Sequence, residues 1–284
     1  MTDNAAEIAT NRANWNDRAA AHASRSGLGY AVQRYVDDRE LLSEVVRFDL
    51  ERLGDVAGLR TVHLQCHIGT DTLSLARLGA RVTGLDFSPV AIAEARALVA
   101  ESGDAEAHGI DFVESDVDSA LQALEPASFD LVYTGIGALC WLPRIRDWAE
   151  VVAGLLKPGG RLFIREGHPI LWTVDERLSD DLHHRFPYFE QGTALEWDDD
   201  ASYVPTDRPI AATKTYEWNH GLGEIVTALL DAGLQLTGLV EHDSIPWEGL
   251  PGQMEERPGG EFALDARAGV MPLSFTLQAV KPAA

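Results

Sequence analysis

The first residues that could do chemistry lie around one glycine, Gly69, and one carboxylate, Asp86. Gly69 follows a run of apolar residues, and Asp86 ends the next apolar run, after a short helical stretch that Gly79 closes. This order of strand, loop, helix and strand is the layout of a nucleotide-binding unit. In such a unit the first turn meets the cofactor and the acid binds ribose hydroxyls. Both nicotinamide dinucleotides and S-adenosylmethionine (SAM) are bound by units of this kind.

The residues of the loop argue against a dinucleotide. The G-x-G-x-x-G signature is absent, because residues 65–71 read Gln-Cys-His-Ile-Gly-Thr-Asp, with one glycine where that motif needs three. None of Lys157, Lys214 and Lys281 has a tyrosine four positions before it. Hydride transfer of the short-chain dehydrogenase kind therefore lacks its acid, and a nicotinamide enzyme is disfavoured.

Strands and helices that would position these groups alternate from residue 59 onward. The strands are predicted at residues 61–65, 81–86, 111–114, 130–134 and 161–166, and the helices between them at 71–78, 89–101 and 145–156. Ser88-Pro89 is a good helix start, with a capping hydroxyl followed by proline at the first helical position. Short connections between alternating elements predict a parallel sheet with helices on both faces.

The flanking segments differ from this alternating core. Helical spacing predicts helices over 6–23, 38–53 and 223–232, and two long strands are predicted at 234–243 and 273–281 as an antiparallel pair closing the sheet edge. Residues 168–215 are rich in aromatics, proline and aspartate and show little periodicity, which favours an inserted lid. The expected divisions are a helical cap (1–58), a cofactor-binding core (59–167), a lid (168–215) and a segment that completes the sheet (216–284).

Composition limits the partners. The formal net charge is −22 over 284 residues, and a surface this acidic repels nucleic-acid phosphates and anionic lipids. The two cysteines, Cys66 and Cys140, stand far apart, which favours free thiols in a reducing compartment. No apolar stretch approaches the roughly 20 residues of a membrane span. We therefore expect a cytoplasmic protein, a monomer or homodimer, without nucleic-acid or membrane partners.

Five stretches together carry a family resemblance. They are Leu64–Ser74, Val82–Ser88, Val113–Asp116, Phe129–Thr134 and Leu155–Phe163. In this order they resemble a class I SAM-dependent methyltransferase, in a subgroup whose first loop reads Leu-Gln-Cys-His-x-Gly-x-Asp-Thr in place of acidic-x-Gly-x-Gly-x-Gly. The resemblance implies an α/β fold. Its Rossmann-like, mostly parallel seven-stranded sheet would have an antiparallel last strand, a helical N-terminal cap and an insert after the fifth strand.

The resemblance also implies a set of SAM-binding residues. Gln65 takes the place of an acid that engages the ammonium, His67 that of a glycine, and Asp71 that of the last glycine. Gly69 would let the backbone approach the methionine part of SAM, and Asp86 would accept both ribose hydroxyls. The other implied contacts are Phe87, Asp116 and Val117 at the adenine, Thr134 and Gly135 at the methionine part, and Tyr30 in the N-terminal cover.

Acceptor groups are expected beyond the carboxyl ends of the strands. The candidate bases are Glu166, His168 and His220, and the candidate substrate-binding residues are Trp141, His168, Tyr203 and Trp218. A hydrogen-bonded loop histidine is the plainer interpretation of His168, and a surface residue before a helix that of His220. No metal site is expected, because Asp198-Asp199-Asp200 is typical of a solvated loop.

The resulting hypothesis is a SAM-dependent methyltransferase acting on an oxygen or nitrogen of a small molecule, with S-adenosylhomocysteine as its second product. The alternative is a SAM-binding protein of the same fold that transfers no methyl group, either a cyclase-like enzyme or a sensor.

Overall fold

The computed structural model describes residues 4–104 and 109–283. Its centre is a seven-stranded sheet in the order β3-β2-β1-β4-β5-β11-β8. The strands are β1 (Arg60–Leu64), β2 (Arg81–Asp86), β3 (Asp111–Glu114), β4 (Phe129–Thr134), β5 (Leu156–Gly167), β8 (Gln235–His242) and β11 (Ser274–Val280). Strands β1 to β5 are parallel, and β11 runs antiparallel between β5 and β8. The predicted mixed sheet is thereby confirmed.

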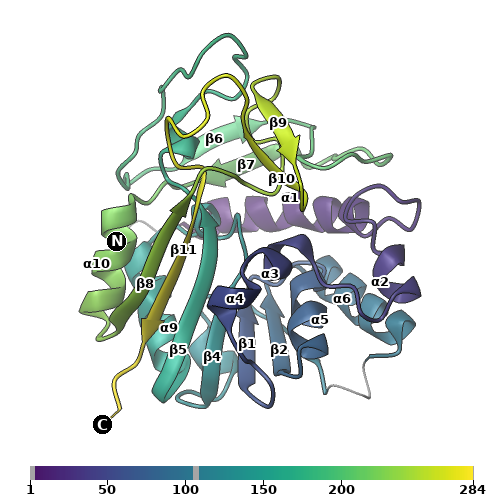
Figure 1. Cartoon of the computed structure of the whole chain (residues 1–284), viewed down its shortest axis with the longest axis vertical. Coiled ribbons are helices and arrows are strands. Elements are labelled where there is room, and N and C mark those ends of the chain that lie inside the picture. Colours follow the sequence, from purple (N-terminus) through teal and green to yellow (C-terminus); the bar gives the residue numbers. More distant parts are fainter. Residues whose placement is uncertain (1–3, 105–108, 284) are drawn as a thin grey trace.

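Helices cover both faces of the sheet (Figure 1). One face packs on α9 (Ile145–Leu155) and α10 (Leu222–Asp231), through buried side chains that include Trp148 and Ile225. The other face packs on α3 (Glu44–Phe48), α4 (Leu50–Leu53) and α5 (Thr70–Arg77). Beside α5 lies α6 (Pro89–Ser102), which contacts α1 (Ala5–His22), α2 (Gln33–Asp37) and Phe112. A shorter helix, α8 (Ala120–Ala123), precedes β4.

Two of these helices test the sequence signals. The Ser88 hydroxyl accepts a hydrogen bond from the Ala91 amide at 3.0 Å, with Pro89 in the first turn, so the predicted start of α6 is confirmed. A single helix over 38–53 is wrong, because the chain forms α3 and α4 with Asp49 between them. The Asp49 carboxylate accepts hydrogen bonds from Thr276 and Arg52, and these tertiary bonds hold the break in the helix.

A second layer lies over the upper end of the sheet. In Figure 1, α1 runs across this end, where the parallel strands finish, and β6 (Leu195–Asp198) and β7 (Lys214–Glu217) lie above it. The antiparallel pair β9 (Met254–Arg257) and β10 (Glu261–Leu264) was not expected in a stretch rich in glycine and proline. Its turn contains Gly259 and Gly260, whose φ angles of +91° and +78° favour glycine.

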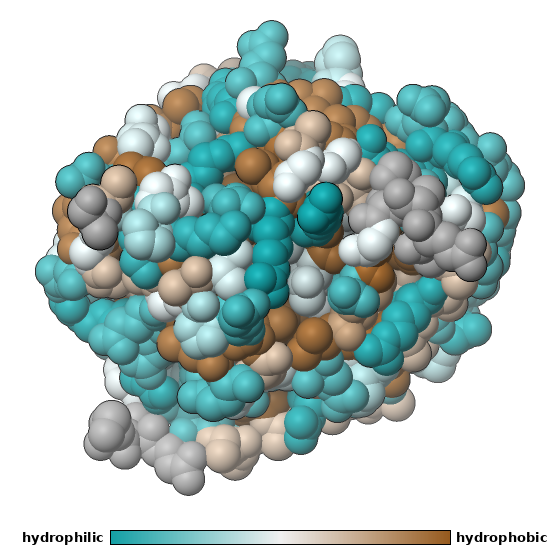
Figure 2. Space-filling view, turned by 90° about the horizontal axis from the view of Figure 1, so that it is seen from below, coloured by the Kyte–Doolittle hydropathy of each residue, from teal (hydrophilic) through white to brown (hydrophobic). Residues whose placement is uncertain are grey.

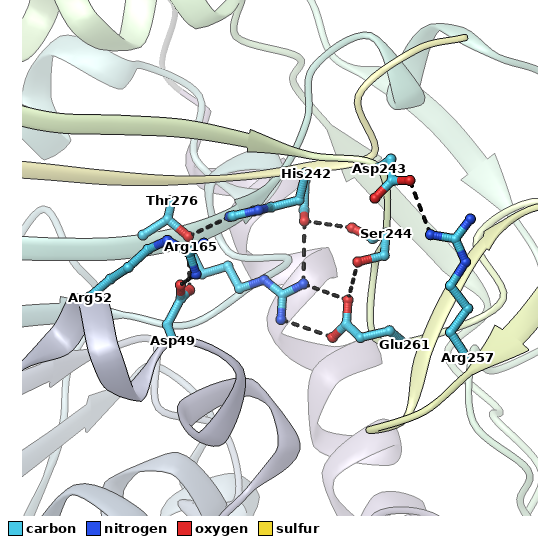
Figure 3. A network of polar contacts seen from close by, with 10 residues as sticks. Asp49, Arg52, Arg165, His242, Asp243, Ser244, Arg257, Glu261 and Thr276 are labelled. Carbon is cyan, nitrogen blue, oxygen red and sulfur yellow. Dashed lines mark hydrogen bonds and ion pairs between the residues drawn. The ribbon is translucent and has the colours of Figure 1, made fainter. Parts of the chain in front are cut away.

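A buried ionic network ties this upper layer to the sheet (Figure 3). Both terminal nitrogens of Arg165 on β5 donate to Glu261 on β10, at 3.0 and 2.7 Å, and the Ser244 hydroxyl donates to the same carboxylate. The Arg165 guanidinium also lies 3.6 Å from the centre of the Phe48 ring. Arg165 is fully buried, so its charge is balanced inside the protein by Glu261.

The opposite end of the molecule differs in character. Figure 2 views it from below and shows hydrophilic residues over much of the surface, with hydrophobic residues in smaller groups between them. Within the described ranges, no helix combines the length and the apolar character that crossing a bilayer requires.

Candidate functional site

The loop after β1 has an unusual backbone. Gln65, His67 and Gly69 have φ angles of +55°, +50° and +79°, so every second residue is left-handed. Glycine adopts such angles without strain and other residues rarely do, so this is the backbone of a G-x-G-x-G loop with glycine at its third position alone. Asp71 lies in the first turn of α5, where the backbone is helical. The left-handed positions of this loop are thus 65, 67 and 69, whereas the register expected from sequence placed the glycine positions at 67, 69 and 71.

Gly69 is required by the protein's own packing. A Cβ atom at this position would lie 2.9 Å from the Ala95 Cβ and 3.2 Å from the Phe112 ring. The glycine therefore lets the loop pack closely on α6 and β3. The sequence-based explanation was an approach to the methionine part of SAM, and the structure supplies a different physical reason.

Asp86 holds the end of β2 against this loop. Its two carboxylate oxygens accept the amide protons of His67 at 2.9 Å and Ser88 at 2.8 Å. Burial raises the pKa of Asp86 to about 6, although its backbone hydrogen bonds act in the opposite direction. The hydroxyl of Ser88 is 2.7 Å from the Asn16 Oδ1 of α1, so the N-terminal helix lies directly over this corner. Phe87 is half-buried between the two residues.

Polar groups without partners gather between β1 and β4. The Gln65 side-chain nitrogen donates to the Ala138 carbonyl at 2.8 Å, while its buried Oε1 has no hydrogen-bond partner in the part of the chain that the structure describes. The same holds for the buried hydroxyl of Thr134, a residue that stands opposite Leu64 in the β1–β4 register. A polar ligand group placed here would satisfy both atoms.

Asp71 and Gly135 complete this corner. A Cβ atom on Gly135 would lie 3.0 Å from the Asp71 Oδ2 and 3.5 Å from the His63 Nε2, so only glycine leaves the carboxylate its place. Loss of solvation raises the pKa of Asp71 to about 6. His63 itself is buried, its Nδ1 is 2.9 Å from the Thr72 hydroxyl, and burial lowers its pKa to about 3.

An aromatic cluster covers the loop from the side of α1. His22 Nδ1 and His67 Nε2 are hydrogen-bonded at 2.9 Å, and the His22 ring stacks on Tyr30 with centroids 5.2 Å apart. The Tyr30 hydroxyl is hydrogen-bonded to that of Tyr203. Burial lowers the pKa of His22 to about 2 and that of His67 to about 3, so both rings are neutral. The predicted contacts Tyr30, His67 and Tyr203 are thus brought together.

Trp141 joins the same cluster and stands apart from the two cavities described below. Its ring meets that of Trp15 edge to face, with centroids 5.1 Å apart, and its indole N–H donates to the Gly137 carbonyl at 2.9 Å. On the adenine side of the expected site, Asp116 is exposed and accepts the Ser119 amide proton at 2.7 Å, while Val117 is buried in the core beside it.

Comparison with known proteins agrees with this geometry. A sequence model of the methyltransferase domain family matches residues 62–162. A SAM-dependent methyltransferase structure from Mesorhizobium loti shares 22% identity at a TM-score of 0.55, covering 84% of this chain and 98% of that one. A Listeria monocytogenes structure assigned to the same class gives 18% identity and a TM-score of 0.60 over the same shares. The chain has a class I methyltransferase fold.

A curated relative is similar over part of its length. The ubiquinone biosynthesis O-methyltransferase of Xanthomonas euvesicatoria pv. vesicatoria is 37% identical over 110 residues, which are 39% of this chain and 44% of the relative. The chain therefore matches less than half the length of that relative.

Glu166 is fully engaged by backbone. Its carboxylate accepts amide protons from Gly137, Ala138, Leu139 and Gly167, at 2.5 to 2.8 Å, and its side chain is 2% exposed. These bonds hold the loop after β4 in place. The geometry favours a positioning residue over the predicted base, because every bond would weaken on protonation.

His168 lies away from the other candidates. Its Nε2 is 3.0 Å from a carboxylate oxygen of Glu241 on β8, and its Nδ1 accepts the Ile170 amide proton at 3.2 Å. Burial lowers the pKa of His168, while Glu241 acts to raise it. The plainer interpretation, a hydrogen-bonded loop histidine, describes this contact set.

His220 and Trp218 do reach a common cavity. A pocket of about 210 Å³ is lined by residues from the ends of β4, β5 and β7, among them Glu166, Trp218 and His220. His220 is bound on both sides, with its Nδ1 2.8 Å from Glu190 and its Nε2 2.8 Å from the Leu142 carbonyl. The ring therefore anchors the segment before α10.

A second, larger pocket adjoins the first. Its volume is about 490 Å³, part of it open to solvent, and it shares Cys140, Trp172, Trp218 and Asn219 with its neighbour. Two carboxylates line it, Glu176 and Glu217, and sequence reasoning singled out neither. A usable signal was present, because Glu217 stands beside Trp218, which sequence reasoning had named as a candidate substrate-binding residue. Within the described ranges, no three His, Cys, Asp or Glu side chains group as a metal site would require.

Proposed function

We propose that this protein is a SAM-dependent methyltransferase that transfers a methyl group to an oxygen or nitrogen of a small molecule. The observation that carries the proposal is that Asp86, and the Gln65 Oε1 and Thr134 Oγ1 atoms that lack partners among the described residues, lie at the carboxyl ends of the neighbouring strands β2, β1 and β4. A carboxylate suits a ribose diol, an amide oxygen suits an ammonium group, and a hydroxyl can bond to either an ammonium or a carboxylate. The class I fold and the match to a methyltransferase domain support the same assignment.

The nucleoside half of SAM is assigned to the β2 and β3 ends. The ionised carboxylate of Asp86 accepts hydrogen bonds from the ribose hydroxyls, and these hydrogen bonds favour its deprotonated form. Phe87 and Val117 supply apolar contacts to the adenine, and Asp116 accepts from its amino group.

The methionine half is assigned to the β1 and β4 ends. Gln65, Thr134 and Asp71 present oxygen atoms suited to the SAM ammonium, and Gly135 leaves room beside them. His67 and Tyr30 belong to the aromatic cluster, which covers this part of the site and limits access of water.

The chemistry places modest demands on the protein. Bound SAM supplies a methyl group attached to a positively charged sulfur. The protein residues position the two reactants and exclude water, and positioning is a large source of rate in such two-substrate reactions. The Glu166 carboxylate contributes indirectly, by holding the loop between β4 and the second pocket.

The acceptor is assigned as a small molecule. The formal net charge of −22 disfavours a nucleic-acid acceptor, and two recesses lined largely by aromatic and apolar residues lie near the strand ends. The curated relative is named an O-methyltransferase, which supports oxygen as an acceptor atom.

Calorimetry tests the cofactor assignment. SAM and S-adenosylhomocysteine are expected to bind and NAD is not. Asp86→Ala is expected to lower SAM affinity by about 100-fold, since two charge-assisted hydrogen bonds contribute about 3 kcal/mol together. Because Asp86 also accepts two backbone amide protons, the variant is first shown to be folded by circular dichroism at the temperature of the titration. Tight NAD binding without SAM binding would overturn the proposal, and normal SAM binding by the variant would remove Asp86 from the site.

The remaining assignments are also proposals. We infer that 1–58 and 168–215 act as cap and lid over the core at 59–167, with 216–284 completing the sheet. Hydrogen bonds between Asn11 and Asn14 of α1 and residues 212–216 support a joined cap.

We also infer a cytoplasmic protein that is a monomer or a homodimer. The free cysteines Cys66 and Cys140 support the reducing compartment. Light scattering of the purified protein separates the two oligomeric states.

A further inference from the structure

The second pocket lies beside the loop that follows β4. This loop contains the short helix η1 (Leu139–Trp141), and the Trp218 amide donates to the Cys140 carbonyl at 2.9 Å. Cys140 lines the pocket, while the next residue, Trp141, contacts the aromatic cluster over the cofactor loop. The pocket is therefore separated from the proposed SAM site by a single turn of chain.

The walls of this pocket are aromatic. Trp172, Phe186, Trp197 and Trp218 line it, from four separate segments. The buried Trp197 indole N–H faces the Glu217 carboxylate and acts to lower the pKa of that group, but among the described residues it makes no hydrogen bond of normal geometry. Aromatic faces of this kind attract cations, Trp most strongly.

Two carboxylates bring negative charge into the same space. Burial raises the pKa of Glu217 to about 7, and the neighbouring Glu176 adds to the increase. Glu176 is an exposed residue; partial loss of solvation raises the pKa of its carboxyl group, with Asp199 adding to the increase. Among the described residues, neither carboxylate has an ion pair within 4 Å, so above about pH 7, where Glu217 ionises, its negative charge has no ion-pair partner.

Two arginines oppose these carboxylates. Arg177 is paired with Asp175, lies over the Phe186 and Trp197 rings, and lowers the pKa of the adjacent Glu176. Arg18 on α1 lowers the pKa of both carboxylates, and its hydrogen bonds go to the Asn14 side chain at 2.7 Å and the Ala201 carbonyl at 3.3 Å. Arg18 therefore moderates the negative potential without neutralising it by contact.

We propose that this pocket binds the methyl acceptor, and that the acceptor is a protonated amine on an apolar body, held between the tryptophan rings and the carboxylates of Glu176 and Glu217. The inference rests on the proposed function and names its substrate class. An ammonium group supplies a counter-charge for the two carboxylates, and the apolar body packs against the aromatic walls.

Glu217 can also accept the proton that an ammonium group must lose before its nitrogen is methylated. One ammonium proton passes to Glu217, which leaves a lone pair on nitrogen. That lone pair forms a bond to the methyl carbon as the carbon–sulfur bond breaks, and the bonding electrons remain on sulfur. The products are the N-methylated ammonium ion and S-adenosylhomocysteine, and Glu217 later releases its proton to water.

Tryptophan fluorescence of the full-length protein tests this assignment, because three tryptophans line the pocket. The probes are 2-phenylethylamine, 2-phenylethanol and 3-phenylpropanoate at about pH 8, where an alkylammonium with a pKa near 10 keeps its charge. The amine is expected to bind about tenfold more tightly than the alcohol, and the anion most weakly. Equal binding of amine and alcohol would overturn the proposal, and tighter binding of the alcohol would favour a hydroxyl acceptor instead.

Two variants and a matched control locate the effect. Glu217→Gln and, independently, Glu176→Gln are expected to reduce the amine's advantage about tenfold and leave binding of the alcohol unchanged. Glu196→Gln is the control, since this carboxylate lies on the adjoining strand β6 but is exposed and paired with Lys214. An amine preference that survives in both pocket variants would contradict the assignment.

SAM titration of the same proteins separates this inference from the proposed function. SAM affinity is expected to be unchanged in Glu217→Gln and Glu196→Gln. If wild-type protein binds the amine selectively but binds no SAM, the pocket assignment holds and the methyltransferase proposal fails. If SAM binds but the amine binds no more tightly than the alcohol, the pocket assignment fails and the methyltransferase proposal stands.

Discussion

At the scale of single residues, Asp86 is a proposed binding group whose ionised form is disfavoured by burial. Its carboxylate is 6% exposed, and burial raises its pKa to about 6 even though two backbone amides donate to it. The folded protein therefore binds a proton here more readily than the unfolded chain. This contribution to stability is present below about pH 4 and is lost as the pH rises through about 6. The ionised state that ribose hydroxyls require is thus the less stable one.

SAM binding should follow the opposite pH dependence. Because the proposed ribose contact needs ionised Asp86, affinity is expected to be level near pH 7 and to fall toward tenfold per unit below about pH 6. Asp71, whose pKa is also raised to about 6, would steepen the fall if it too must ionise. Calorimetric titration between about pH 5 and 7 measures the slope.

Single substitutions assign that slope. Asp86→Asn is expected to bind SAM weakly at every pH, and its pH dependence of affinity is expected to lack the contribution of one titrating carboxyl group. Asp71→Asn is expected to remove only the contribution of Asp71. A wild-type slope in Asp86→Asn would show that another group is responsible.

At the scale of elements, α1 decides whether the site is covered. Asn11 is 1% exposed, and its amide exchanges two hydrogen bonds with the Tyr216 backbone of β7, at 2.7 and 2.8 Å. The carboxylate of Asp17 accepts from the amides of Ala211 and Ala212. Helical spacing predicted this helix, but its buried polar residues serve a neighbouring strand, and that neighbour could not be read from local sequence.

Asn11→Ala should loosen this cover selectively. The substitution leaves the Tyr216 amide and carbonyl without partners, at a cost of about 1–3 kcal/mol. Hydrogen exchange is expected to become faster in α1, β6 and β7, and to stay unchanged in β1 to β5. Thr10→Ala is the matched control, since its hydroxyl bonds only to the Ala6 carbonyl at the surface. Uniformly faster exchange throughout the sheet would contradict a local role.

At the scale of the whole molecule, the network around Arg165 connects segments that are far apart in sequence. Arg165 on β5 is paired with Glu261 on β10, and Thr276 on β11 is bonded to Asp49 before α4 (Figure 3). The sheet, the N-terminal helices and the C-terminal hairpin therefore share one set of buried charges. Arg165 precedes the candidate base Glu166 in the chain, but its own side chain serves the fold.

Removing one charge from this network should destabilise the entire protein. Glu261→Gln leaves Arg165 buried without its counter-charge, and the free energy of unfolding is expected to fall by about 3–5 kcal/mol in urea titration. Arg146→Ala, which breaks the exposed pair with Asp231, is expected to cost less than about 1 kcal/mol. The double variant Arg165→Met/Glu261→Met is expected to recover much of the loss. A change below about 1 kcal/mol in Glu261→Gln would refute a stabilising role for the pair.

Local signals in the sequence determined the alternating strands, the ends of β2 and β3, and the start of α6 at Ser88 and Pro89. These features depend on neighbours along the chain, because alternation, capping and turn residues act over a few positions. The same signals placed Asp86 at a strand end. They also predicted the mixed sheet, since short connections leave few ways to join such elements.

Only the tertiary structure decided which polar groups are free to act. His168 turned to Glu241, and Glu166 was saturated by four backbone amides, while Glu176 and Glu217 came from separate segments to face one aromatic pocket. Each outcome depends on burial and on partners distant in sequence. A carboxylate becomes a binding group when its solvation is removed and no partner replaces it, and that condition is set by the packing of remote segments.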